Sequence, residues 1–151
     1  MKKGIGRNKI LYIDSNIFIF AAINQDEYGV KCRRIIELIE ENRISCAASY
    51  LIIDEVIWVL KKKIGKKDAI KITRAILSLP IKWLNIDEPS IMRMINIIEN
   101  TDIDPRDALH VACMMNNGLS TILSEDKDFD RIKGIRRMGI EEFLENYRIK
   151  E

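Results

Sequence analysis

The sequence predicts an α/β protein built on a parallel sheet with helices on both of its faces. Along the 151 residues, short apolar runs alternate with longer stretches in which apolar residues recur at helical spacing. Such strand–helix alternation favours a parallel sheet that is covered on both sides. The composition, with 47% hydrophobic and 32% charged residues, is typical of a globular protein, and the length is sufficient for a substantial core.

The apolar runs are predicted to form strands at residues 9–14, 43–49, 81–86, 120–124 and 135–138. Helical spacing predicts helices at residues 30–42, 49–63, 66–79, 88–100, 105–117 and 140–147. Ser49 is expected to cap the second of these helices, and Gly118 is expected to end the fifth. An acidic loop, residues 125–130, follows the fourth strand.

We expect residues 1–151 to form a single domain, with residues 1–9 as a disordered N-terminal extension. The net charge of +2 neither requires nor excludes nucleic acid. The three cysteines are far apart and the chain has one histidine, which argues against a structural zinc site and predicts buried, reduced thiols. No stretch approaches the roughly 18 apolar residues of a membrane span. We therefore expect a cytoplasmic protein with no membrane partner.

Acidic residues follow two of the predicted strands at the point where each strand ends. Asp14 comes directly after the first apolar run, and Asp126 and Asp128 follow the fourth within five residues. Ligands of open parallel sheets bind beyond the carboxyl ends of the strands, so these acids are expected at one edge of the sheet. The structural alternatives are an Asx turn at Asp14 and a solvated acidic turn for the later pair.

Two further acids are predicted to lie on core-facing sides of helices. At about 100° per residue, Glu55 falls inside the apolar arc of helix 49–63, where a bare charge is costly and needs a partner. The structural alternative for Glu55 is a buried salt bridge to Arg or Lys. Asp107 heads the core-facing stripe of helix 105–117, at a helix N-terminus that favours a carboxylate. Its alternative is a capping-box-like pair with Asp104, which is expected to cap that helix.

Acids from four segments are therefore expected to meet: Asp14, Glu55, Asp107 and Asp126, with Asp128 adjacent. Like charges ~4 Å apart repel by ~4 kcal/mol at an effective dielectric constant near ~20, so such a cluster must be protonated or bind a cation. Oxygen ligands without imidazole or thiolate favour Mg²⁺ or Mn²⁺. A hard cation in a carboxylate cluster is suited to activating water for attack on a phosphodiester.

Motifs in these segments, LYIDSNIF, LIIDEVIWVL, PRDALHVA and ILSEDKDFDRI, resemble the landmarks of PIN-domain ribonucleases. The resemblance is greatest to the VapC-type toxins of toxin–antitoxin pairs and runs from about Ile10 to Tyr147. It implies a three-layer domain with a five-stranded parallel sheet and a Mg²⁺- or Mn²⁺-dependent site at the carboxyl edge. The catalytic acids that it implies are Asp14, Glu55, Asp107 and Asp126. The metal ligands that it implies are Asp14, Asp107, Asp126 and Asp128.

Other residues are expected to support these acids. By the resemblance, Asn16 would orient Asp14 or a water molecule on the metal. Ser124 stands where the family often has threonine and keeps the hydroxyl group. His110 lies three residues after Asp107, near the same helix face, and is expected to pack or to form a hydrogen bond behind the acids rather than to act as a general base.

The expected reaction is hydrolysis of RNA phosphodiesters by a water molecule that the metal makes more acidic. Basic runs flank two of the acidic motifs, which makes four residues candidates for RNA contacts, with ordinary solvated faces as the alternative: Lys62, Lys63, Lys66 and Arg136. Trp58 and Trp83 are expected to be buried rather than stacked on bases. An antitoxin protein and a homodimer are partners implied by the resemblance alone.

Three other functions stay open. A solitary PIN nuclease that acts in RNA processing shares every motif above. A phosphoryl-transfer domain of the haloacid-dehalogenase or receiver type also places an acid after its first strand, but the motif DSN has asparagine where such a phosphatase needs its second aspartate. A non-catalytic RNA- or partner-binding module would use the acids as caps and salt bridges, which the position of Glu55 on an apolar helix face argues against.

Overall fold

The computed structural model describes residues 9–150, which form five strands and seven α-helices. The strands are β1 (Leu11–Ile13), β2 (Cys46–Ser49), β3 (Lys82–Leu84), β4 (Thr121–Leu123) and β5 (Arg136–Met138). The helices are α1 (Ser15–Ile23), α2 (Glu27–Glu40), α3 (Tyr50–Ile64), α4 (Lys66–Leu77), α5 (Glu88–Asn100), α6 (Pro105–Asn116) and α7 (Ile140–Lys150). The extension expected at residues 1–9 lies, except for Lys9, outside the described residues.

The strands form one sheet in the order β3-β2-β1-β4-β5, and each neighbouring pair is parallel. The predicted α/β fold with a five-stranded parallel sheet is therefore confirmed. β1 is the central strand, and its three side chains are at most 2% exposed. Because all strands run in the same direction, the segments that follow β1, β2 and β4 leave from one edge of the sheet.

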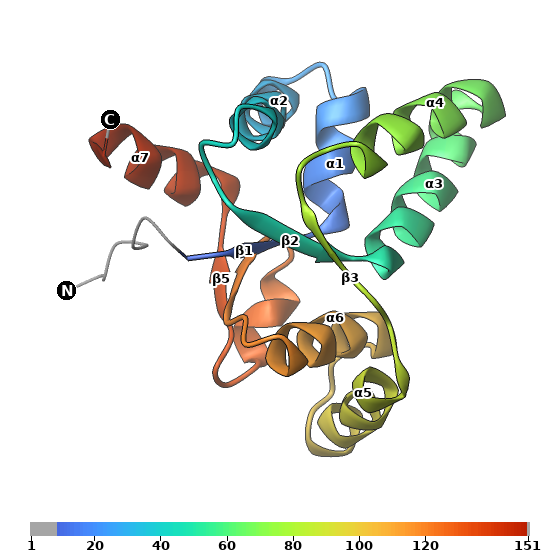
Figure 1. The fold of residues 1–151 in the computed structure, drawn as a ribbon, viewed down its shortest axis with the longest axis vertical. Coiled ribbons are helices and arrows are strands. Elements are labelled where there is room, and N and C mark those ends of the chain that lie inside the picture. Colours follow the sequence, from blue (N-terminus) through green and yellow to red (C-terminus); the bar gives the residue numbers. More distant parts are fainter. Residues whose placement is uncertain (1–8, 151) are drawn as a thin grey trace.

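Helices cover both faces of this sheet, as strand–helix alternation predicts (Figure 1). Helices α1 to α4 lie on one face, and α5 and α6 lie on the other as an adjacent pair (Figure 1). α3 and α4 form a hairpin at Gly65, whose φ of 87° is in the left-handed region that glycine adopts without a steric penalty. The last helix, α7, contacts α2. None of the helices within residues 9–150 is long and apolar enough to cross a membrane.

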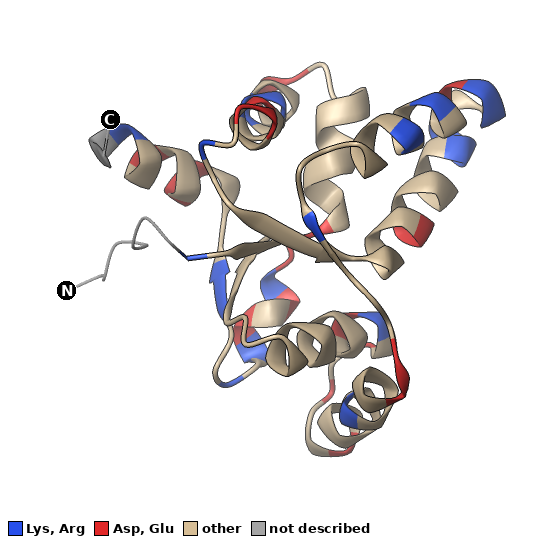
Figure 2. Cartoon of the chain, in the orientation of Figure 1, with Lys and Arg blue, Asp and Glu red and all other residues tan. Residues whose placement is uncertain are grey.

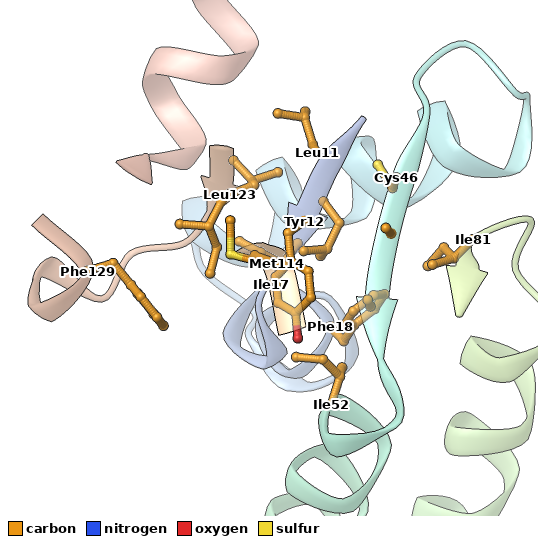
Figure 3. Close-up of a cluster of buried hydrophobic side chains, with 14 of the residues drawn as sticks. Leu11, Tyr12, Ile17, Phe18, Cys46, Ile52, Ile81, Met114, Leu123 and Phe129 are labelled. Carbon is orange, nitrogen blue, oxygen red and sulfur yellow. The ribbon is translucent and has the colours of Figure 1, made fainter. Parts of the chain in front are cut away.

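The core lies between the sheet and these helices, with Tyr12, Ile17, Ile52 and Met114 among its fully buried members (Figure 3). All three cysteines are buried and free, which agrees with the expectation of unpaired thiols. Burial raises the pKa of the Cys46 thiol to about 12, so this thiol stays protonated and behaves as a small apolar group.

The sequence-based elements differ from the structure in four respects. Helix α1 was not predicted, because the segment Ser15–Ile23 is apolar along almost its whole length and has no polar face that would reveal a helical period. Each strand is shorter than its apolar run, and β1 ends at Ile13 so that Asp14 becomes the N-cap of α1. The acidic loop contains a 3₁₀ helix, Lys127–Arg131. The side chains of Ser49 and Asp104 occupy N-cap positions without making a capping hydrogen bond.

Candidate metal centre

The predicted acids gather beyond the carboxyl edge of the sheet. Asp14 directly follows β1, and Asp126 follows β4, which is the strand next to β1 in the sheet. Glu55 extends from the second turn of α3, which leaves β2, and Asp107 lies in the first turn of α6. Four elements that are distant in sequence thus bring the acids together.

The potential ligand atoms form two groups, in each of which the atoms lie within 4.8 Å of one another. The first group, here called the inner group, consists of Asp14, Glu55 and His110. The second, here called the outer group, consists of Asp107, Asp126 and Asp128. The expected cluster of carboxylates is therefore present, and it is divided into two parts.

Asp14 is buried, at 6% exposure, and is held by three neighbours. It accepts hydrogen bonds from the Ser15 backbone N–H at 2.8 Å, from Asn16 Nδ2 at 3.2 Å and from Ser124 Oγ at 2.5 Å. Burial raises the pKa of Asp14, whereas the nearby His110 and the hydrogen bonds from Ser124 and Ser15 oppose that shift. The carboxyl group is therefore fixed in orientation but needs positive charge nearby to ionise readily.

Asn16 connects Asp14 to Ser124 and leaves one polar atom without a partner. Its Nδ2 donates to Asp14 Oδ2 and to Ser124 Oγ, both at 3.2 Å, so the amide oxygen must face the other way. This Oδ1 is buried and has no hydrogen-bond partner among the described residues. An unpaired buried acceptor costs about 1–3 kcal/mol. This oxygen and the carboxylates of the two groups form an oxygen-rich donor set, which fits Mg²⁺ or Mn²⁺.

Glu55 has a partner other than the Arg or Lys of the structural alternative. Its Oε1 lies 2.6 Å from Nε2 of His110, which is completely buried. The other ring nitrogen of His110, Nδ1, lies 2.6 Å from the hydroxyl of Tyr12. Because both nitrogens are hydrogen-bonded, His110 has no lone pair free for a metal ion in this arrangement, although it belongs to the inner group.

The outer group is less tightly held. Asp126 Oδ1 accepts from the Asp128 backbone N–H at 2.9 Å, and the Asp126 backbone N–H donates to Ser124 Oγ at 3.0 Å. Among the described residues, none donates a hydrogen bond to the Asp107 carboxylate. Burial raises the pKa of Asp107 to about 7, and the negative charges of Asp126 and Asp14 add to that shift. A divalent cation between these carboxylates would remove the repulsion.

The predicted RNA-binding residues lie outside the two groups. Lys62, Lys63 and Lys66 are exposed around the tip of the α3–α4 hairpin, where basic residues gather away from the sheet (Figure 2). Arg136 begins β5 at the opposite, amino edge of the sheet and forms an ion pair with Glu142 at 2.9 Å, so it is not brought to the acids. The expectation that Trp58 is buried is wrong, because 57% of it is exposed.

Sequence reasoning missed two polar residues behind the acids. Tyr12 lies in β1 two positions before Asp14, and its hydroxyl also forms a hydrogen bond with Ser49 Oγ at 2.8 Å. The signal available in the sequence was weak: Tyr12 is the one hydroxyl-bearing residue in an otherwise aliphatic run, and the two-residue period of a strand aligns it with Asp14. The sequence predicts Ser49 only as a helix cap.

Several solved structures are similar to this chain. VapBC2 from Rickettsia felis, bound to a DNA fragment from its promoter, has 15% identity and a TM-score of 0.69 over 86% of this chain and 98% of that chain. DNA-bound VapBC from Salmonella typhimurium has 20% identity and a TM-score of 0.68 over 87% and 98% of the two chains. VapC20 from Mycobacterium tuberculosis, a Sarcin-Ricin loop cleaving toxin, has 15% identity and a TM-score of 0.65 over 80% and 92%. At these identities the likeness is one of fold.

The sequence comparisons agree with the likeness of fold. No curated protein gave a match to this sequence. The family model of the PIN domain matches residues 11–135, a span that contains all four motifs and both acidic groups. The resemblance seen in the motifs is thereby confirmed, and the chain belongs to the PIN domain family.

Proposed function

We propose that the protein is an endoribonuclease that hydrolyses RNA phosphodiesters with Mg²⁺ or Mn²⁺, and that it is the toxin of a toxin–antitoxin pair. PIN domains are nucleases, and the similar solved structures are of VapC-type proteins. The observation that carries the proposal is the meeting of acids from four elements at one sheet edge, beside the unpartnered Asn16 Oδ1.

We assign metal binding to the aspartates and orientation of the attacking water to Glu55. Asp14, Asp107, Asp126 and Asp128 would hold the metal, because all are carboxylates of the two groups and no described residue donates a hydrogen bond to Asp107. When bound, a divalent ion makes water more acidic and stabilises charge on phosphate oxygens. Ser124 and Asn16 keep the Asp14 carboxylate in one orientation. Glu55 uses Oε1 for His110 and leaves Oε2 to accept a hydrogen bond from the attacking water, which orients it toward phosphorus.

The side of α3 that carries Glu55 continues beyond the acids and is suited to a single-stranded RNA. Trp58 and Lys62 follow Glu55 by about one and two helical turns, so they extend the same side of the helix away from the acids. The Lys62 ammonium lies 3.5 Å from the centre of the exposed Trp58 ring. An aromatic face takes an unpaired base, and an ammonium group takes a phosphate. We propose that the RNA lies along Trp58 and Lys62, with Lys63 and Lys66 at its far end.

An antitoxin would have a suitable groove among the helices α1, α2 and α4. A pocket of about 330 Å³ lies between α1, α2 and α4, with an apolar lining that includes Phe18, Ile36 and Ile76. Charged residues at its side, Arg33 and Glu37, offer partners for an amphipathic peptide. For the homodimer, the exposed apolar side chains of α5, Ile91, Met92 and Ile95, provide a surface. A cellular RNA substrate implies a cytoplasmic location.

The decisive experiment is divalent-dependent cleavage of a panel of structured RNAs by the wild-type protein and by Asp14→Asn, purified in the same way. The proposal predicts cleavage with Mg²⁺ or Mn²⁺ that disappears in EDTA and in Asp14→Asn. Equal cleavage by both proteins would reveal a contaminating nuclease. No cleavage by the wild type, together with no Mn²⁺ binding in calorimetry, would leave the non-catalytic binding module as the better account.

A further inference from the structure

A line of hydrogen bonds runs through the core and ends at Glu55. The hydroxyls of Ser49 and Tyr12 are 2.8 Å apart, the Tyr12 hydroxyl is 2.6 Å from His110 Nδ1, and His110 Nε2 is 2.6 Å from Glu55 Oε1. Ser49, Tyr12 and His110 are each 0% exposed. The members come from β2, β1, α6 and α3, so the line crosses the sheet and joins both helical layers.

The surroundings of this line are apolar, which makes its polar atoms costly unless all are paired. Figure 3 shows Tyr12 among apolar side chains such as Ile17, Ile52 and Met114. Burial raises the pKa of Tyr12 far above its usual value, so the hydroxyl keeps its proton. A phenylalanine would fill nearly the same space without any need for partners. Packing alone therefore does not explain the hydroxyl group of Tyr12.

The hydrogen-bond inventory of these groups limits how the protons are arranged. An ionised carboxylate only accepts, so His110 Nε2 must carry a proton to bond with Glu55. In neutral histidine, Nδ1 is then an acceptor, and the Tyr12 hydroxyl is the donor at that atom. Because the Tyr12 hydroxyl has only one proton to donate, the Ser49 hydroxyl, 2.8 Å away, is then the donor to the Tyr12 oxygen, together with the Ser49 backbone N–H at 3.3 Å.

We propose that Tyr12 is a positioning residue: anchored by Ser49, it holds the His110 ring so that Nε2–H faces Glu55 and keeps that carboxylate in its working orientation. This inference rests on the proposed function, since it assigns the residues that orient the water-positioning acid. Tyr12 and His110 do not touch the substrate. They act only through Glu55, which distinguishes their role from that of the acids.

The first test uses nuclear magnetic resonance on the metal-free protein and does not depend on activity. His110 is the only histidine of the chain, so the two ring nitrogens give unambiguous ¹⁵N signals. The proposal predicts a proton on Nε2 in the wild type and a clear change of the Nδ1 and Nε2 shifts in Tyr12→Phe. An unprotonated Nε2 in the wild type, or unchanged shifts in Tyr12→Phe, would overturn it. The backbone amide spectrum of each variant shows whether it is folded.

The second test is a double-mutant cycle on RNA cleavage, with Tyr28→Phe as the control because that tyrosine is exposed on α2. Tyr12→Phe is expected to lower kcat by ~10-fold with an unchanged KM, as is typical when a partner behind an active-site ligand is removed. In the Glu55→Gln background, Tyr12→Phe should cause no further loss. An equal loss in both backgrounds would mean that Tyr12 acts independently of Glu55 and would contradict the proposal.

The two tests separate failure of this inference from failure of the proposed function. If the wild type cleaves no RNA, the nuclease proposal fails while the ring-nitrogen signals still decide whether Tyr12 sets the orientation of His110. If the wild type cleaves RNA and the Tyr12→Phe protein is folded but has normal kcat, the positioning role is wrong and the nuclease proposal stands.

Discussion

The inner and outer acidic groups differ in how the protein holds them. In the inner group, Asp14 accepts hydrogen bonds from three neighbouring residues and Glu55 has His110, so both carboxylates are oriented before any ligand arrives. In the outer group, one carboxylate oxygen of Asp126 accepts a hydrogen bond from the Asp128 backbone N–H. Asp107 accepts no hydrogen bond from the described residues. The fold thus supplies orientation to one group and leaves the other to be completed by a ligand.

This difference implies opposite responses to the loss of charge. Removing an inner carboxylate leaves donors such as Ser124 and His110 without their acceptor. Removing an outer carboxylate relieves repulsion, which adds to the effect of burial in raising the pKa of Asp107 to about 7. The predictions below test whether the two groups respond in these ways, from the largest expected effect to the smallest.

The largest effect is expected on catalysis, and it should be shared by both groups. Asp14→Asn and Asp126→Asn should each lower kcat/KM for RNA by more than ~100-fold. Removal of a residue that only supports a metal ligand already lowers metal affinity or activity by about 10–100-fold. Initial rates at saturating Mn²⁺ provide the measurement. Asp130→Asn is the matched control, since Asp130 lies in the same loop and pairs with Arg137 at 3.0 Å. A variant of either acid with normal kcat/KM would remove that acid from the site.

Metal binding should stabilise the wild type much more than the protein that lacks the Asp107 carboxylate. A ligand at 100 times its Kd stabilises a protein by about 2.7 kcal/mol, which corresponds to a rise in Tm of roughly 5–10 °C for a chain of this size. We expect this rise with Mn²⁺ in the wild type and less than half of it in Asp107→Asn, as measured by calorimetry. The same rise in both proteins would show that the outer group does not hold the metal.

The stability of the metal-free protein should fall as the pH rises toward neutrality. Asp107 has a folded-state pKa of about 7 against its usual value of 3.8, so between these values the unfolded chain releases a proton that the folded protein retains. The free energy of unfolding therefore decreases with rising pH over this window and changes no further above it. Asp107→Asn should lack this part of the decrease and, at pH 8 in EDTA, should melt ~3 °C higher than the wild type.

Asp102→Asn is the control for that measurement, because Asp102 is exposed in the segment before the same helix, whereas the charge of Asp104 itself helps to raise the pKa of Asp107. Its Tm should follow the pH dependence of the wild type. If Asp107→Asn melts at a lower temperature than the wild type at pH 8, the repulsion inferred for the outer group is absent.

The smallest effect is expected outside both groups. Trp58→Ala and Lys62→Ala should each raise KM for a single-stranded RNA by ~5-fold or more with little change in kcat, because base stacking contributes about 1–3 kcal/mol per base. Lys133→Ala is the control, since Lys133 is exposed in the turn that precedes β5, near the amino edge of the sheet. An unchanged KM in both α3 variants would mean that the RNA takes another path.

The sequence by itself determined the fold class and the identity of the acids. Strand and helix periods are local properties, so the alternation of apolar runs predicted the parallel sheet and its covered faces. The rule that parallel strands end at one edge then predicted where Asp14 and Asp126 would lie, and counting residues around a helix predicted that Glu55 faces inward. Helix α1 escaped the same reasoning because its segment is too apolar to show a period.

Only the tertiary structure decided how the acids are divided and what holds them. The partner of Glu55 is 55 residues away in sequence, the partner of Tyr12 in α6 is 98 residues away, and Ser124 is 110 residues from Asp14. No local pattern encodes such pairings, because they arise when four elements pack together and their buried polar atoms must find donors and acceptors. Packing likewise left Trp58 exposed on α3 and paired Arg136 with Glu142, far from the acids.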